Sequence, residues 1–182
     1  RDNDNASPDK LITDYKSNEI ENKLRFEYFA NPGKWTLNAG AGTEYAVYTN
    51  NTLAYIFREG SLLQIDYDSR LEMVKWAFFA SVSRRLLNDH MSVSAGFRAD
   101  ANNYSSYMNN PLDQFSPRVS ASYTLLPSLT INGSAGRFFQ LPSYTTLGFR
   151  DSNDVTVNRG NGLKYIQADH LIGGLEWKVS PT

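Results

Sequence analysis

Residues 118–136 read RVSASYTLLPSLTINGSAG, and this stretch carries the two signals that decide the fold. In its first half apolar and polar residues alternate, so that Val119 and Tyr123 share one face of an extended chain. The alternation stops at Leu126-Pro127-Ser128 and resumes from Leu129 to Gly136. Alternation with a period of two predicts a β-strand, and a short break containing Pro predicts a tight turn. The stretch therefore predicts a β-hairpin.

Five further segments alternate in the same way. They are Leu24–Tyr28, Trp35–Gly42, Val74–Ser83, Met91–Asp100 and His170–Val179. With the two strands of the hairpin they make about seven strands, most of them near the roughly 9–11 residues that a tilted strand needs to cross a bilayer. Helical spacing is scarce throughout. We therefore predict an all-β fold, an antiparallel up-and-down meander of about seven long strands.

The connections between these strands alternate between short and long. The expected short turns are Asn31-Pro32-Gly33, Leu87–His90 and Leu126-Pro127-Ser128, with a fourth beginning at Ser180-Pro181-Thr182. The expected long loops are Thr49–Ser69, Asp100–Gln114 and Gln140–Lys164. Consecutive turns of a meander fall on opposite edges, so all short turns share one rim and all long loops share the other. Bacterial outer-membrane barrels have this asymmetry, which predicts part of a transmembrane β-barrel.

Composition excludes several classes of function. The chain has 182 residues with 18 Lys plus Arg and 19 Asp plus Glu, so it lacks the basic surplus that nucleic-acid binding requires. It has no cysteine, which excludes a disulfide scaffold, a thiolate metal site and a cysteine nucleophile. The sequence contains no run of about 18 apolar residues, so it predicts no transmembrane helix.

The alternation by itself does not identify the solvent on the apolar face. Tyr28, Trp35 and Trp177 lie near the ends of strands that meet short turns, where a membrane interface favours amphipathic rings. The same aromatic residues could fill the core of a soluble domain. The pattern therefore leaves open a membrane barrel, a small stand-alone outer-membrane barrel, and a soluble barrel or sandwich that binds a small ligand.

Three consecutive segments resemble one family. Phe115–Thr124, read FSPRVSASYT, is similar to the "FSPR…SY" strand of TonB-dependent outer-membrane receptors. Leu129–Ser143 resembles the "LxxxxxxGFRxPS" strand of that family, and Gly162–Trp177 resembles its "NPxLKPE…ELGxE" segment. The chain departs from the family pattern at Tyr165-Ile166, where Pro-Glu is common, and at Arg159-Gly160-Asn161, which replaces Asn-Pro. The resemblance is strongest over residues 115–177.

The resemblance implies that residues 1–182 are one internal segment of a receptor barrel, without the plug. Barrels of this family have about 22 strands closed around a plug. The implied function is transport of a bulky nutrient, namely a siderophore, haem, cobalamin or an oligosaccharide, across the outer membrane of bacteria. The implied partners are outer-membrane lipid, the plug domain, the TonB complex and the small nutrient ligand. The resemblance implies no enzymatic activity and no cofactor.

Two sets of residues are candidates for contact with a ligand. The loop residues Tyr104, Tyr107, Asn109 and Asn110 combine aromatic rings with amides, a mixture that can stack on and hydrogen-bond a sugar or a siderophore. The charged residues Arg98, Asp100 and Arg118 fall on the polar face of their strands and are predicted to face the lumen. The histidines His90 and His170 have no converging partners in the sequence pattern, so we predict no catalytic and no metal site.

Seven strands without neighbours have two open edges. Unpaired strand edges invite pairing with another chain. We therefore expect edge-mediated self-association if this segment is produced alone.

Overall fold

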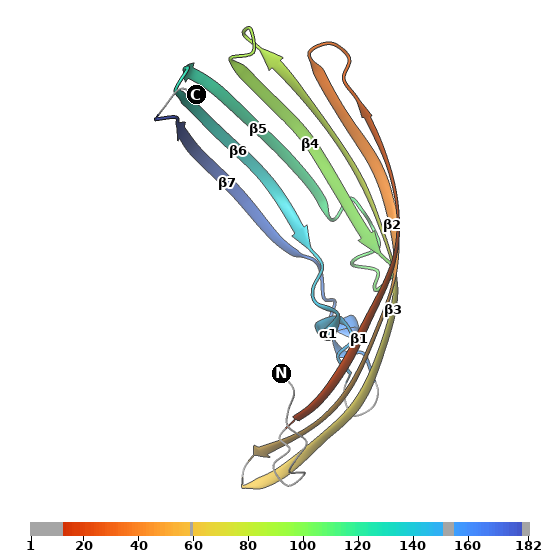
Figure 1. The fold of residues 1–182 in the computed structure, drawn as a ribbon. Coiled ribbons are helices and arrows are strands. Elements are labelled where there is room, and N and C mark those ends of the chain that lie inside the picture. The colour runs from red at the N-terminus through yellow and green to blue at the C-terminus, as the bar shows by residue number, and fades with distance from the viewer. Residues whose placement is uncertain (1–12, 59, 151–154, 180–182) are drawn as a thin grey trace. The chain divides into compact units, whose positions relative to one another are not determined.

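The computed structural model describes residues 13–58, 60–150 and 155–179, and within them the chain is almost entirely β-structure (Figure 1). The strands are β1 (Thr13–Ala30), β2 (Trp35–Arg58), β3 (Ser61–Leu86), β4 (Met91–Asn102), β5 (Phe115–Leu126), β6 (Leu129–Gln140) and β7 (Ile166–Trp177). Two short helices, α1 (Tyr144–Leu147) and α2 (Val157–Gly160), lie between β6 and β7. The strand order in the sheet is β1-β2-β3-β4-β5-β6-β7. The predicted all-β antiparallel meander of seven strands is therefore confirmed.

The chain divides into two compact units. The first unit comprises Arg1–Asn22, Tyr45–Met73 and Pro142–Leu163, and the second comprises Lys23–Glu44, Val74–Leu141 and Lys164–Thr182. β1, β2 and β3 contribute residues to both units, whereas β4 to β7 belong to the second. In Figure 1 the strands β4 to β7 run side by side.

The sheet of the second unit has an apolar face and a polar face. Its most exposed large apolar residues lie on the apolar face and are Leu24, Phe26, Leu171, Leu175 and Trp177. Leu171 leaves 88% of its surface exposed. Soluble monomers rarely expose a continuous apolar face, whereas a barrel wall in lipid requires one. The polar face is the face that carries Ser94, Arg98 and Arg118.

The short turns form where they are expected. Gly33 adopts a φ of 64°, which only a residue without a Cβ adopts easily, and the Trp35 amide donates to the Pro32 carbonyl at 3.2 Å. Leu87, Asn88 and Asp89 form a run with φ values of 52°, 51° and 70°. The turn expected at Ser180-Pro181-Thr182 lies outside the described residues.

The prediction of a long loop over Thr49–Ser69 is wrong. β2 continues to Arg58 and β3 begins at Ser61, so this segment is a tight hairpin of two extended strands. Its polar residues pair across the strands, as when the Asn51 side chain donates to Asp68 at 2.6 Å. The alternation also continues unbroken, because Ala46, Tyr48, Asn50 and Thr52 are all buried. The polar composition of this segment is compatible with strands, because polar side chains can pair across a β-ladder. Polarity alone therefore does not predict a loop.

The other two long connections are present. The first runs from the end of β4 at Asn102 to the start of β5 at Phe115, and the second joins β6 to β7 through α1 and α2. Within the described residues neither helix has the length or the apolar character to span a membrane.

The first unit is held by a small core between its strands and α1. Tyr48, Met73 and Leu147 are almost completely buried there. The Tyr48 hydroxyl lies 3.1 Å from that of Tyr15 and 3.4 Å from the hydroxyl of Thr145. These contacts dock the connection between β6 and β7 onto β1 and β2 inside the first unit.

Candidate functional site

The loop between β4 and β5 is compact and firmly attached to the second unit. Asn102 is fully buried, and its backbone amide donates to the Met108 carbonyl at 2.9 Å. Asn103 pairs with Val74 of β3 twice, because its amide donates to the Val74 carbonyl at 3.1 Å and its side-chain oxygen accepts from the Val74 amide at 2.9 Å. The loop therefore presents its outer side chains from a fixed backbone.

The four residues predicted to contact a ligand lie in this loop but differ in accessibility. Tyr104 is buried with 3% of its surface exposed, whereas Tyr107 is 50% exposed. Asn109 and Asn110 are exposed. The Asn110 side chain organises the turn itself, because it accepts from the Leu112 amide at 3.2 Å and donates to Asp113 at 3.1 Å.

Tyr107 has a cationic neighbour from a distant part of the sequence. The Lys164 ammonium lies 5.4 Å from the centre of the Tyr107 ring, close enough for a cation–π contact. The loop between β4 and β5 therefore offers an accessible aromatic ring and an accessible amide, at Tyr107 and Asn109. The connection before β7 adds an ammonium group beside the ring, at Lys164. Their contact with a ligand remains a prediction.

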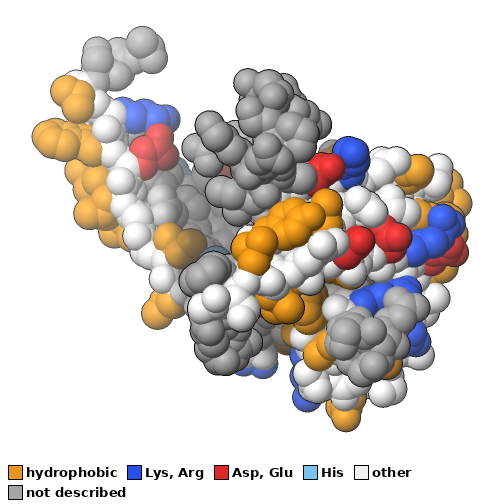
Figure 2. Space-filling view, turned by 90° about the horizontal axis from the view of Figure 1, so that it is seen from below, with side chains coloured by type: hydrophobic (Ala, Val, Ile, Leu, Met, Phe, Trp, Pro, Cys, Tyr) orange, Lys and Arg blue, Asp and Glu red, His pale blue; other side chains and the backbone are white. Residues whose placement is uncertain are grey.

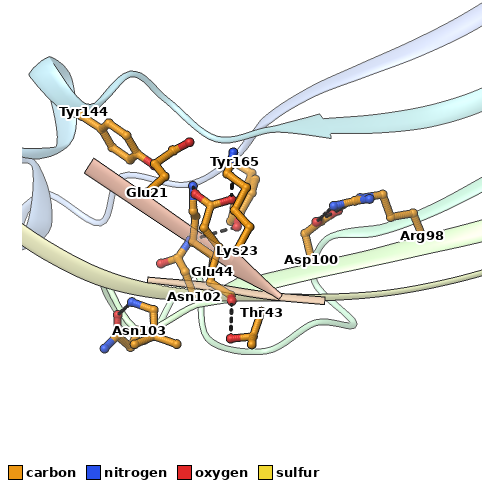
Figure 3. Close-up of polar contacts among 12 residues, drawn as sticks. Glu21, Lys23, Thr43, Glu44, Arg98, Asp100, Asn102, Asn103, Tyr144 and Tyr165 are labelled. Carbon is orange, nitrogen blue, oxygen red and sulfur yellow. Dashed lines mark hydrogen bonds and ion pairs between the residues drawn. The ribbon is translucent and has the colours of Figure 1, made fainter. Parts of the chain in front are cut away.

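The three charged residues predicted to face the lumen lie on the polar face of the second unit. Arg98 and Asp100 form a two-pronged ion pair on β4, with the Arg98 Nε 2.7 Å from Asp100 Oδ2 and the Arg98 Nη2 2.6 Å from Asp100 Oδ1 (Figure 3). Arg118 of β5 lies opposite Gly96 of β4, and Gly96 is two residues from Arg98 along that strand. That this face forms a lumen remains a prediction.

A second charged group borders a hollow of about 410 Å³ on the polar face. Glu44 lies 3.3 Å from the Lys23 ammonium and also forms an ion pair with Lys75. The Thr43 hydroxyl donates to the Lys75 carbonyl at 3.1 Å, as drawn in Figure 3. The Glu44 carboxylate thus lies between two ammonium groups beside this hollow. Lys and Arg side chains also lie next to Asp and Glu side chains on the face in Figure 2.

Tyr165 connects the end of the second long connection to β4. Its hydroxyl accepts from the Asn102 side chain at 2.9 Å. Burial raises the pKa of the Tyr165 phenol, against the opposing effect of the Asn102 hydrogen bond, so the phenol is neutral at physiological pH. Tyr165 is one of the residues at which the chain departs from the receptor motif, and the structure gives it a role in fixing Asn102.

Phe79 and Arg25 form a stacked pair over a glycine on the same face. A Cβ on Gly40 would lie 2.5 Å from the Phe79 ring, so only glycine lets the ring lie over this strand. The Arg25 guanidinium lies 4.8 Å above the centre of the ring. Arg25 also forms an ion pair with Glu27 at 2.8 Å.

Sequence reasoning missed Glu44 and Tyr165. Glu44 continues the alternation of Gly40 and Gly42 on the polar face, and this signal could have identified it. Tyr165 follows no periodic pattern, and its contact with Asn102 spans 63 positions, so no local signal existed.

The histidines take structural positions. A ring nitrogen of His90 lies 3.0 Å from the Leu87 carbonyl of its own turn. The His170 ring packs against Phe138 with 4.7 Å between ring centres. In the described part of the chain no three His, Asp or Glu residues are grouped to hold a metal ion.

One comparison with known proteins identifies a family. The sequence model of the family described as "TonB dependent receptor-like, beta-barrel" matches residues 1–180. No curated protein matches the chain.

Proposed function

Since this match covers nearly the whole chain, the chain belongs to the TonB-dependent receptor-like β-barrel family, and we propose that it forms wall and outer loops of a barrel that imports a bulky nutrient. The family comprises receptors and transporters of the bacterial outer membrane and is not a family of enzymes. Full-length members interact with a plug, with TonB and with a ligand. The proposed nutrient classes are ferric siderophores, haem, cobalamin and oligosaccharides.

The observation that carries this proposal is the division of the sheet into two faces. The apolar face leaves Leu171, Leu175 and Trp177 largely exposed, which suits contact with lipid and disfavours a soluble β-domain. The opposite face carries the ion pair of Arg98 and Asp100, which suits a water-filled interior.

Tyr107 and Asn109 are the proposed nutrient contacts. They are exposed on a loop whose backbone is held by Asn102 and Asn103, and a rigid loop loses little conformational entropy when it binds. A tyrosine ring with an amide neighbour can stack on a ring of the nutrient and hydrogen-bond its polar groups.

An uptake experiment tests the proposal. Cells producing the full-length protein would be given radiolabelled ferric siderophore, haem, cobalamin or maltooligosaccharide, with and without TonB. The double variant Tyr107→Ala/Asn109→Ala should reduce uptake of one nutrient at least tenfold. The matched double variant Tyr28→Ala/Asn31→Ala removes the same residue types near a short turn and should leave uptake unchanged. Absence of TonB-dependent uptake for every nutrient class would refute import of these compounds.

Self-association of the segment produced alone is a separate proposal. It rests on β1 and β7, which are the edges of the described sheet. Light scattering of the isolated segment should report dimers or larger species, and a monodisperse monomer would contradict the proposal.

A further inference from the structure

The strand register places a glycine on each side of Arg118 in the sheet. Arg118 of β5 is paired with Gly96 of β4 on one side and with Gly136 of β6 on the other. A Cβ on Gly136 would lie 3.2 Å from Arg118 Cγ and 3.3 Å from the Phe138 ring, so a side chain there would crowd both. The two glycines therefore leave room beside the Arg118 side chain on the polar face.

An aromatic ring supports the guanidinium of Arg118. The Phe138 ring centre lies 4.4 Å from Arg118 Cζ, and the His170 ring packs against Phe138. Stacking on a ring orients an arginine while leaving its N–H groups available in the plane of the guanidinium. No carboxylate in the described part of the chain pairs with Arg118, whereas Arg98 is paired with Asp100 and Arg25 with Glu27.

A row of hydroxyl groups lies beside Arg118. Ser94, Ser120 and Ser134 are paired in sequence across β4, β5 and β6, two residues from the row that contains Arg118. Among the described residues none of these three hydroxyls has a side-chain or backbone hydrogen-bond partner. They are therefore donors available to a ligand.

These groups border one hollow of about 370 Å³ in the second unit. Its lining includes Arg25, Arg98, Arg118 and His170 and contains no Asp or Glu among the described residues. Arg25 and Arg98 are each paired with a carboxylate, whereas Arg118 has no such partner among the residues that the structure describes, so Arg118 supplies the positive charge of this hollow. The hollow has the size of a small-ligand site.

We propose that Arg118, with the hydroxyls of Ser94, Ser120 and Ser134, binds an oxyanion, namely a carboxylate or phosphate group of a small molecule. The guanidinium supplies two parallel N–H donors that match the spacing of carboxylate or phosphate oxygens, and the serines supply further donors. This proposal deepens the proposed function, because it assigns a ligand chemistry to the polar face of the wall.

Calorimetric titration of the purified full-length protein in detergent tests the site without any transport step. Citrate and inorganic phosphate would be titrated separately, at constant ionic strength maintained with chloride. Saturable binding should weaken about 10- to 100-fold in Arg118→Gln, because a charge-assisted hydrogen-bonded contact is lost. Arg118→Lys keeps the charge without the two-pronged donor geometry and should give an intermediate affinity.

A matched control separates a specific site from general charge effects. Arg137 precedes Phe138 on β6 and lies on the opposite face, paired with Asp169 at 2.8 Å. Arg137→Gln changes the net charge by the same amount and should leave anion binding unchanged. The double variant Ser120→Ala/Ser134→Ala should weaken binding with Arg118 intact.

The outcomes are distinguishable. Binding of citrate but not phosphate would assign the site to carboxylates, and the reverse would assign it to phosphates. Absence of saturable binding by either anion, or an equal loss in Arg137→Gln, would overturn the proposal. Since the titration needs no TonB and no nutrient uptake, its failure would leave the transport proposal intact, and a failure of uptake would leave the anion site intact.

Discussion

Replacement of Leu147 by alanine should release the connection between β6 and β7 from the first unit. Leu147 ends α1 and is fully buried there, with 0% of its surface exposed. α1 has only four residues, so its own hydrogen bonds cannot maintain it without packing. The helix should therefore depend on the Leu147 side chain for its position.

The expected cost follows from the burial of this side chain. Replacing a fully buried leucine by alanine destabilises a protein by about 2–5 kcal/mol, through lost transfer free energy and the cavity that remains. Since about 1.4 kcal/mol corresponds to a factor of ten, the population of the opened state should rise between about 30-fold and a few thousandfold.

Hydrogen exchange of the full-length protein in detergent measures this opening. The Leu147 and Gly148 amides donate to the Ser143 and Tyr144 carbonyls at 2.9 Å and 2.7 Å and should exchange faster by the same factor. Leu112→Ala is the matched control, because Leu112 lies in the other long connection and is 74% exposed. That variant should change exchange by less than about threefold, as expected for a surface substitution.

Two results would refute this reasoning. If Leu147→Ala accelerated exchange of these amides less than fivefold, packing of Leu147 would not hold the connection. If Leu147→Met, which nearly conserves volume, destabilised as much as Leu147→Ala, the loss would not arise from a cavity.

Three further predictions concern Tyr48, Gly40 and Asn102. Burial raises the pKa of the Tyr48 phenol from 10.0 to about 12. The neutral phenol therefore contributes fully to the stability of the folded state below pH 10, and this contribution is lost as the pH rises from 10 towards 12. Proteolysis of the first unit should accelerate over this range in the wild type and much less in Tyr48→Phe. Gly40→Ala should destabilise the folded protein by about 1–3 kcal/mol, because the new Cβ would lie 2.5 Å from the Phe79 ring. On electrophoresis of samples heated to increasing temperatures, the band of the folded protein should disappear at a lower temperature. Gly173→Ala, with no atom within 4 Å of the new Cβ, should leave that temperature unchanged. Asn102→Ala removes buried hydrogen bonds and should cost about 1–3 kcal/mol, seen as faster exchange in the loop that follows β4.

The strands were predictable wherever an apolar face alternates with a polar one. Val119 and Tyr123, for example, belong to β5 as expected, because side chains of a strand point to opposite faces in turn. The prediction failed at Thr49–Ser69, where both faces carry polar residues. Asn50 and Thr52 are both buried, so the alternation persists there. Tyr48, just before this segment, is in contact with Tyr144 and Thr145 of α1, which are distant in sequence.

The candidate site was predictable in composition but not in arrangement. Arg98, Asp100 and Arg118 share a polar face because each occupies the same phase of the alternation in its strand. Pairing of Arg98 with Asp100 follows from their separation of two residues on β4. The burial of Tyr104 and the exposure of Tyr107 do not follow from the sequence, because they depend on how the loop folds back onto β3.

The sequence by itself determined the alternating part of each strand, the short turns and the face on which those side chains lie, because alternation and turn chemistry are local properties. It did not determine the strand segments within Thr49–Ser69. The tertiary structure alone decided which residues meet across strands. Between Thr124 and Leu126 the register of β5 and β6 shifts by one residue. Continued from the turn without this bulge, the pairing of Leu126 with Leu129 would set Arg118 opposite Arg137; with it, Arg118 lies opposite Gly136. One extra residue in a strand moves every pair beyond it, and this shift is what gives Arg118 its room.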